Sequence, residues 1–321
     1  MNVVAIAGAD GGLGSRVRAL LDADDAVDKV VSIGSGELAD GDLKRLLHGA
    51  RTVVHLAPPV ATTLDATRRL FDAAGDAGVR HVIVLSSALV YGAWANNPVP
   101  LTEDAPLKPN PGFEPAVELG QLERLAAEWR DAHPGATVAV LRPAVPVAED
   151  DAGWLAPMLQ AVRPVPVGED DPPGQFVHLD DVAAAIDLVR RRDLHGAYNV
   201  APEGWIAGDD LRALAGGPRL RLPGRVAERL ARVRWRAGLS PTPPGMLPWT
   251  MHPWVVASDR LRAEGWTPAQ SNEEAFVAGH RPPPWATVSP RRRQELALAA
   301  VGVVAAGAVT GVVAGLRRRR S

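Results

Sequence analysis

The stretch Ala7-Gly8-Ala9-Asp10-Gly11-Gly12-Leu13-Gly14 stands directly behind an apolar run at residues 3–6. A strand, a glycine-rich turn and a helix in this order form the context in which glycines hold a phosphate group. Gly8 suits the tight turn, Gly11 lets the backbone approach a pyrophosphate, and Gly14 lets the helix pack closely on the strand. The free N–H groups at the start of that helix stabilise an anion. The stretch therefore predicts a dinucleotide site at the first β-α turn of a doubly wound α/β sheet.

Composition excludes several kinds of site. The chain has 321 residues, of which 46% are hydrophobic, and it has no cysteine, which excludes disulfides, thiolate catalysis and cysteine metal sites. The eight histidines show no paired spacing with carboxylates, so no metal site is predicted. Residues 1–290 hold 28 basic and 36 acidic side chains, whereas residues 291–321 hold seven arginines and one acid. An acidic body argues against nucleic acid, and a basic tail favours an anionic surface.

Apolar runs alternate with helical segments along the first half of the chain. Strands are predicted at Lys29–Ile33, Thr52–Ala57 and His81–Leu85, and a helix at Leu64–Ala77. This alternation is typical of a parallel sheet with right-handed crossovers. In such a sheet ligands bind beyond the carboxyl ends of the strands, the edge at which the glycine stretch lies.

The end of the second strand bears on the kind of dinucleotide. An acid at this position usually binds the adenosine ribose, and Glu37 is the nearby acid. Arg16, in the first turn of the first helix, is an alternative contact for the 2′-phosphate of NADP, although an arginine there is more often simply exposed. The sequence leaves the choice between NAD and NADP open.

Five further motifs carry a resemblance to a known family. Together with the Gly-x-x-Gly-x-x-Gly spacing, they resemble the extended short-chain dehydrogenases/reductases of the NAD-dependent epimerase/dehydratase type, in order over about residues 1–280: Val54–Ala57, Leu85–Gly92, Leu141–Pro143, Phe176–Val182 and Ser258–Pro268. The resemblance implies a Rossmann-type doubly wound parallel sheet with a small C-terminal substrate lobe, and NAD or NADP as cofactor. It assigns the cofactor site to Gly8, Gly11, Gly12, Leu13, Gly14, Leu56, Ala57 and Ser86.

The chain departs from this family at the positions that carry the chemistry. The resemblance implies hydride transfer between a nicotinamide and a sugar or alcohol carbon, with a tyrosine as acid/base and a lysine four residues later. A phenol with a pKa near 10 is a poor base at neutral pH unless a nearby cation stabilises its phenolate. Pro115 stands where the tyrosine belongs and Leu119 where the lysine belongs. The chain's two tyrosines, Tyr91 and Tyr198, are not followed by a lysine at that spacing.

Other residues are candidates for moving a proton. Ser87 matches the catalytic serine of the family, and Tyr91 matches a residue that shapes its pocket. Glu114, Glu118 and His178 qualify by chemistry alone. The two glutamates are also ordinary i, i+4 neighbours near a helix start, and His178 matches a structural strand position.

The second half of the chain divides less clearly. Three parts are expected: a dinucleotide-binding core at 1–145, a mixed region at 146–285 that combines a substrate lobe with elements returning to the core, and a tail at 286–321. From Pro143 onward the chain is rich in proline and tryptophan, and loop-like segments are expected there.

The tail contains an uncharged run of 21 residues, Leu296–Leu316, bracketed by Arg291–Arg293 and Arg317–Arg320. At about 1.5 Å per residue this run spans roughly the ~30 Å hydrocarbon core of a bilayer. A single membrane helix is predicted, with the body on the cytoplasmic face of the cell membrane, while shallow insertion with both arginine clusters on headgroups stays open. A spacing of four residues favours close pairing of two such helices in a homodimer, at Gly307, Gly311 and Gly315.

Two functions are open at this point. The leading hypothesis is a membrane-tethered protein that binds NAD or NADP and has weak or altered catalysis. The alternative is a working NAD(P)-dependent epimerase/dehydratase or oxidoreductase that acts on a sugar or a lipid-like alcohol through a non-standard proton donor. The sequence does not identify the substrate.

Overall fold

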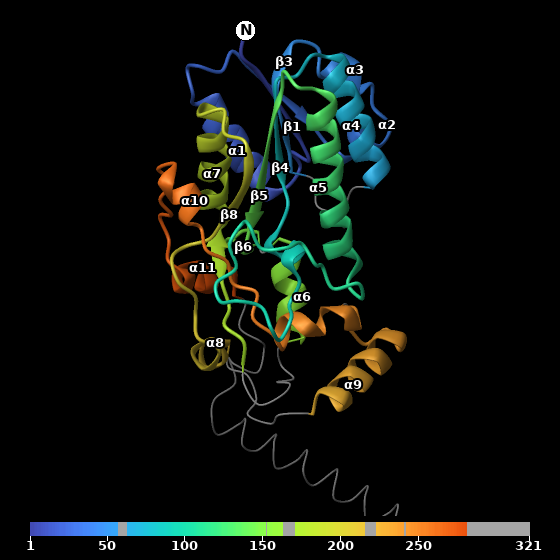
Figure 1. Cartoon of the computed structure of the whole chain (residues 1–321), viewed down its shortest axis with the longest axis vertical. Coiled ribbons are helices and arrows are strands. Elements are labelled where there is room, and N and C mark those ends of the chain that lie inside the picture. Colours follow the sequence, from blue (N-terminus) through green and yellow to red (C-terminus); the bar gives the residue numbers. More distant parts are fainter. Residues whose placement is uncertain (57–62, 152, 163–170, 216–222, 241, 281–321) are drawn as a thin grey trace, which may run out of the picture. The chain divides into compact units, whose positions relative to one another are not determined.

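A parallel sheet of six strands forms the centre of the computed structural model, which describes residues 1–56, 63–151, 153–162, 171–215, 223–240 and 242–280 (Figure 1). The strand order is β2-β1-β3-β4-β5-β8, and every neighbouring pair is parallel. The strands are β1 (Val3–Ala7), β2 (Lys29–Ile33), β3 (Ala50–His55), β4 (His81–Leu85), β5 (Thr137–Pro143) and β8 (Gly196–Val200). The predicted α/β class and the predicted strands at Lys29–Ile33 and His81–Leu85 are confirmed.

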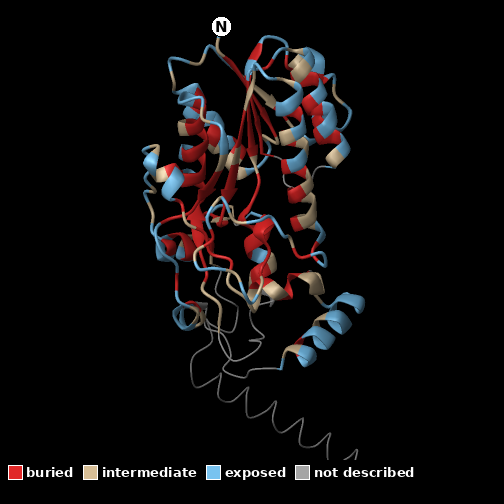
Figure 2. Cartoon of the chain, in the orientation of Figure 1, coloured by how far each residue is buried: buried red, intermediate tan, exposed pale blue. Residues whose placement is uncertain are grey.

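Helices cover both faces of this sheet, which is why its strands read as continuous apolar runs (Figure 2). Successive residues of a strand point to opposite faces, so Val4 and Ile6 of β1 join one core cluster while Val3 and Ala5 join the other. The first face carries α1 (Gly12–Asp22) and α7 (Leu179–Arg191). The other face carries α2 (Ser35–Asp40), α3 (Leu43–Leu46), α4 (Leu64–Asp76) and α5 (Glu114–Ala132).

Shorter elements gather beyond the carboxyl ends of the strands (Figure 1). Among them a second, two-stranded parallel sheet pairs β6 (Val145–Val147) with β7 (Phe176–His178). The chain leaves the large sheet in β6 and returns to it in α7 and β8. The other elements here are η1 (Ala88–Tyr91), α6 (Leu155–Val162), α8 (Gly208–Ala215), α9 (Gly224–Arg236), η2 (Pro244–Thr250) and α11 (Asn272–Gly279), whereas α10 (Asp259–Ala263) lies beside the edge strand β8. The segments after Pro143 thus contain several helices where the sequence suggested loops.

Met1–His280 form one compact unit. The predicted membrane helix at Leu296–Leu316, with Gly307, Gly311 and Gly315, lies outside the described residues. Among the helices that the structure does describe, none has both the length and the apolar character needed to cross a bilayer.

Candidate functional site at the carboxyl ends of the strands

The glycine loop between β1 and α1 has the geometry expected of a phosphate-binding turn. Gly8 has a φ of 82°, in the region that favours glycine, and its N–H bonds to Ile33 O at 2.9 Å. A Cβ on Gly14 would lie 2.5 Å from Ala9 O, so this position needs glycine for close helix packing. A Cβ on Gly11 would meet nothing within 4 Å. Among the described residues, therefore, none fills the space beside Gly11.

The N-terminus of α1 is occupied by a carboxylate from a distant part of the chain. Asp151, which follows β6, accepts a hydrogen bond from the Gly12 N–H at 3.0 Å. A side chain at Gly12 would collide with Asp151, so the glycine also makes room for this contact. A negative charge at a helix N-terminus is stabilised by the unpaired N–H groups and the helix dipole. The carboxylate therefore lies where the start of α1 stabilises an anion.

Arg16 anchors the same segment from the side. Its guanidinium bonds to Asp150 and to Asp180, each at 2.6 Å, and its side chain is 19% exposed. The hydrogen bond with Asp150 is the main cause that raises the pKa of Arg16 above its usual value. Arg16 is thus neither an isolated surface residue nor a free cation for a 2′-phosphate.

The three acids Glu149–Asp151 form what we call the acidic segment. His178 binds the first of them, Glu149. The imidazole caps α7, with Nδ1 accepting from the Asp180 N–H at 3.2 Å, so Nε2 carries the proton that it shares with Glu149 Oε2 at 3.2 Å. His178 is 2% exposed. Its two nitrogens are engaged in structural hydrogen bonds, in keeping with the structural position suggested by the sequence.

Two more carboxylates stand at the end of β2. Asp10 of the glycine loop accepts from the Ser35 N–H at 2.7 Å, and Glu37 accepts from the Gly34 N–H at 2.6 Å. Both acids therefore face the adjacent backbone amides at the strand end. The end of β2 thus carries two carboxylate groups, from Asp10 and Glu37.

A buried polar network fills the space behind the motif Leu85–Gly92. Glu123 of α5 forms a two-pronged ion pair with Arg142 of β5, at 2.7 and 3.1 Å, and both side chains are at most 7% exposed. Ser86 donates to the same carboxylate at 2.6 Å. The hydroxyl of Ser86, a predicted cofactor-site residue, is therefore engaged in this network.

Tyr91 belongs to the same network. Its hydroxyl donates to Asn199 Oδ1 and accepts from Arg142 Nη1, each at 2.8 Å, and the residue is 1% exposed. Burial raises the pKa of Tyr91 to about 12, against the opposing effect of Arg142. Less of such a phenol is ionised at neutral pH than of a free one, so little phenolate is available to accept a proton. Tyr91 links η1 to β5 and β8, and its hydroxyl is committed to those links.

Ser87 caps the short helix η1. Its Oγ accepts from the Leu89 N–H at 3.3 Å, and the residue is 4% exposed.

Two further residues were predicted for the cofactor site. Leu56 donates its N–H to Ala7 O at 2.8 Å beside the glycine loop. Ala57 lies outside the described residues.

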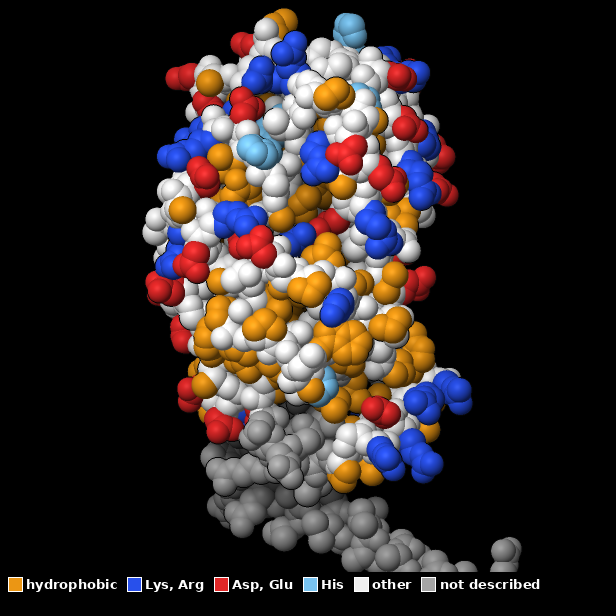
Figure 3. Space-filling model, viewed as in Figure 1, with side chains coloured by type: hydrophobic (Ala, Val, Ile, Leu, Met, Phe, Trp, Pro, Cys, Tyr) orange, Lys and Arg blue, Asp and Glu red, His pale blue; other side chains and the backbone are white. Residues whose placement is uncertain are grey.

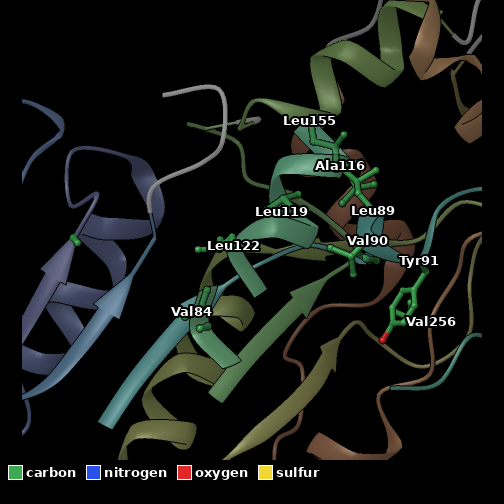
Figure 4. Close-up of a cluster of buried hydrophobic side chains, with 14 of the residues drawn as sticks. Val84, Leu89, Val90, Tyr91, Ala116, Leu119, Leu122, Leu155 and Val256 are labelled. Carbon is green, nitrogen blue, oxygen red and sulfur yellow. The ribbon is translucent and has the colours of Figure 1, made fainter. Parts of the chain in front are cut away.

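The first turns of α5 hold apolar side chains where the resemblance requires acid/base chemistry. Pro115 is the second residue of the helix, where its missing N–H costs no hydrogen bond. Leu119 is 3% exposed and lies in the core among Leu89 and Leu155 (Figure 4). An apolar environment therefore surrounds the position at which a lysine is expected.

The two glutamates of the same helix differ. Glu114 is exposed, whereas Glu118 is partly buried. Burial, and next the charge of Glu114, raises the pKa of Glu118.

Sequence reasoning missed the acidic segment and the network partners Glu123 and Asn199. Arg142 lies inside the motif Leu141–Pro143, but no motif or spacing in the sequence singled out its partner on α5, Glu123. Asp151 lies 139 positions from Gly12, and a run of acids after a strand is an ordinary surface feature. The contact follows only from the folded chain.

Comparisons with known proteins agree with the fold. The model of the NAD dependent epimerase/dehydratase family matches residues 4–201, more than half of the chain. A dTDP-glucose 4,6-dehydratase of Streptomyces griseus is 26% identical over 204 residues, which cover 56% of this chain and 59% of that protein. The match thus spans less than two thirds of the relative's length.

Solved structures share the architecture over most of the chain. The UDP-glucose 4-epimerase of Thermus thermophilus, in complex with NAD, has a TM-score of 0.64 at 19% identity and covers 86% of this chain and 97% of its own. The dTDP-glucose 4,6-dehydratase DesIV of Streptomyces venezuelae, with NAD and TYD bound, has a TM-score of 0.62 at 19% identity, covering 86% and 95%. At such identities these likenesses establish a common fold.

Replacing the core leucine by the family's lysine tests how α5 is packed. We expect Leu119→Lys to lower the free energy of unfolding by about 3 kcal/mol or more, because it buries an ammonium group and removes apolar contacts. Glu128→Lys, at an exposed position of the same helix, is the control and should change stability by about 0.5 kcal/mol or less. Urea unfolding followed by circular dichroism measures both. Equal stability of the two variants would contradict the packing of Leu119.

Proposed function

Because the chain belongs to the NAD dependent epimerase/dehydratase family, we propose that it binds NAD at the glycine loop, has weak or altered catalysis, and is tethered to a membrane by its tail. The observation that carries the cofactor proposal is the loop geometry. Gly8 makes the turn, Gly14 admits the helix, and the open side of Gly11 leaves the backbone free for a pyrophosphate. The loop also lies between β1 and β3, where the strand order reverses and ligands of such sheets bind.

The residues at the end of β2 favour NAD over NADP. Asp10 and Glu37 place two carboxylates near the expected position of the adenosine ribose. A carboxylate there accepts a hydrogen bond from a ribose hydroxyl and repels a 2′-phosphate. Arg16, the alternative cation, is engaged by Asp150 and Asp180.

The acidic segment Glu149–Asp151 competes with the cofactor. A pyrophosphate that uses the Gly12 N–H has to displace the Asp151 carboxylate. The residues of the loop fit the cofactor once this side chain has moved. The affinity for NAD then depends both on the contacts that the glycine loop makes with the cofactor and on the free energy needed to displace the acidic segment.

Altered catalysis is supported by the surroundings of the expected acid/base pair. Bound NAD would supply a hydride acceptor, but a tyrosine base needs a cation beside it. Leu119 offers none, and Tyr91 is buried with a raised pKa. The position of the lysine has become part of the apolar core.

The raised pKa of Glu118 supports a second candidate function. A raised pKa moves a carboxyl group toward the range in which general acids and bases act. In this alternative the chain is a working NAD-dependent epimerase/dehydratase or oxidoreductase on a sugar or lipid-like alcohol. Conversion of candidate nucleotide sugars, followed by NMR of the products because epimerisation and dehydration return the hydride and leave nicotinamide absorbance unchanged, separates the two: turnover that Glu118→Gln abolishes would favour this alternative.

The cofactor proposal predicts the effect of a bulkier residue in the loop. Gly11→Val should weaken NAD binding about tenfold or more, because the side chain fills the space of the pyrophosphate. Gly135→Val is a matched control, since its Cβ is also free of contacts and it lies on the turn before β5. Isothermal titration calorimetry measures both. Equal NAD affinity in the two folded variants would contradict the proposed site.

Removing the charge of the competing carboxylate should have the opposite effect. We expect Asp151→Asn to tighten NAD binding several-fold, and more at low salt than at high salt, because it removes a negative charge from the phosphate position. Glu128→Gln, an exposed acid on α5, should leave the affinity unchanged. Weaker binding by Asp151→Asn would mean that the carboxylate supports the cofactor site.

Membrane tethering is proposed from the sequence of the tail. Leu296–Leu316 would insert with the body on the cytoplasmic face, and Gly307, Gly311 and Gly315 remain the predicted positions for pairing in a homodimer. We expect the full chain to resist extraction by salt and by alkaline carbonate. The double variant Val304→Asp, Val312→Asp should be released into the soluble fraction. Release of the natural chain by salt alone would favour the surface-bound alternative.

A further inference from the structure

Helix α9 stands out from the acidic body by its charge. Its 13 residues include five arginines and one acid, Glu228, which gives a net charge of +4. Within this helix Ala227 alone is buried, and it packs with Leu247 and the partly buried Met251 of the neighbouring segment. Most of the helix surface is exposed (Figure 2).

The exposed surface of α9 carries an apolar stripe. Val226 is 48% exposed, Leu230 39% and Val233 63%, and Ala237 continues the row just beyond the helix. Their spacing of four, three and four residues places them on one side of the helix. At 3.6 residues per turn the stripe lies about a quarter turn from Ala227. It is therefore separate from the side that packs on the body.

Four of the five arginines form a second row beside this stripe, at Arg225, Arg229, Arg232 and Arg236, whereas Arg234 lies nearer the side of Ala227. The same spacing places this row opposite Ala227, so the two rows are adjacent. Figure 3 shows basic side chains gathered at α9 next to apolar surface. The helix thus has one side on the protein, one apolar side and one cationic side.

An occupant of this surface must offer both apolar volume and negative charge along the helix. A bilayer with anionic headgroups offers both at once, because valine and leucine side chains enter the acyl boundary while arginines remain among the headgroups. A nucleic acid backbone matches only the charge. The tail sequence, with its uncharged run between arginine clusters, points to a membrane from different residues.

We propose that α9 lies in the interface of an anionic membrane, with the stripe Val226, Leu230 and Val233 facing the acyl chains. The arginine row then contacts the lipid phosphates. This contact does not depend on cofactor binding, and it involves residues other than the proposed membrane helix. It would bring the substrate-lobe side of the body to the lipid surface.

A single label on α9 tests the proposal, since the natural chain has no cysteine. Val233→Cys in the full chain, labelled with the fluorophore NBD, reports on the stripe, and the matched control Glu228→Cys reports on the side of the helix opposite the stripe. Vesicles of phosphatidylcholine with phosphatidylglycerol should raise the emission and shift it to the blue at position 233, with little change at 228. Vesicles of phosphatidylcholine alone should give a much smaller response at 233.

A second set of variants separates α9 from the tail. Replacing Arg225, Arg229 and Arg232 by glutamine should weaken the vesicle response at position 233 by about fivefold for each arginine. Equal responses at 233 and 228, or none at either, would overturn the proposal even if the full chain sediments with vesicles through its tail. A response at 233 to duplex DNA that matches the response to anionic vesicles would also overturn it.

Discussion

The buried ion pair between Glu123 and Arg142 is the interaction on which the functional end of this fold depends. Two charges removed from water are tolerated only when they are paired and their remaining hydrogen-bonding groups are satisfied. Ser86 and Tyr91 provide those partners, and Asn199 extends the network to β8. Strands β4, β5 and β8 and helix α5 are thereby held in one arrangement. Ser86, Tyr91 and Arg142, which lie inside the motifs that resemble the family, therefore stabilise the fold independently of any reaction.

The residues that the fold requires differ from those that the family's reaction requires. The fold requires Arg142, Tyr91 and the glycine loop, whereas a tyrosine and lysine on α5 are requirements of the reaction. Leu119 adds apolar burial in place of a charged side chain that would have to be solvated or paired. Core packing and acid/base chemistry thus compete for the same position, and in this chain packing occupies it.

The sequence predicted those features that depend on local patterns. Strands covered on both faces appear as unbroken apolar runs, and Gly8 and Gly14 are required by local backbone geometry, so each could be read from a few neighbouring residues. Contacts between distant segments could not, as with Asp151 and Gly12 or Glu123 and Arg142. Helix α9 was missed for another reason. Its arginine and valine spacing is helical, but the proline-rich segments on both sides favoured a loop.

The carboxylate of Asp151 gives the start of α1 an anion from within the chain itself. An intramolecular group is present at a constant effective concentration, whatever the nucleotide supply. The helix terminus is therefore neutralised without a bound ligand. A bound anion would then add less to the free energy of unfolding than it would at an unpaired helix terminus. Loading with nucleotide becomes an exchange of one anion for another. On the proposed function, occupancy would then respond to ionic strength and to the nucleotide concentration together.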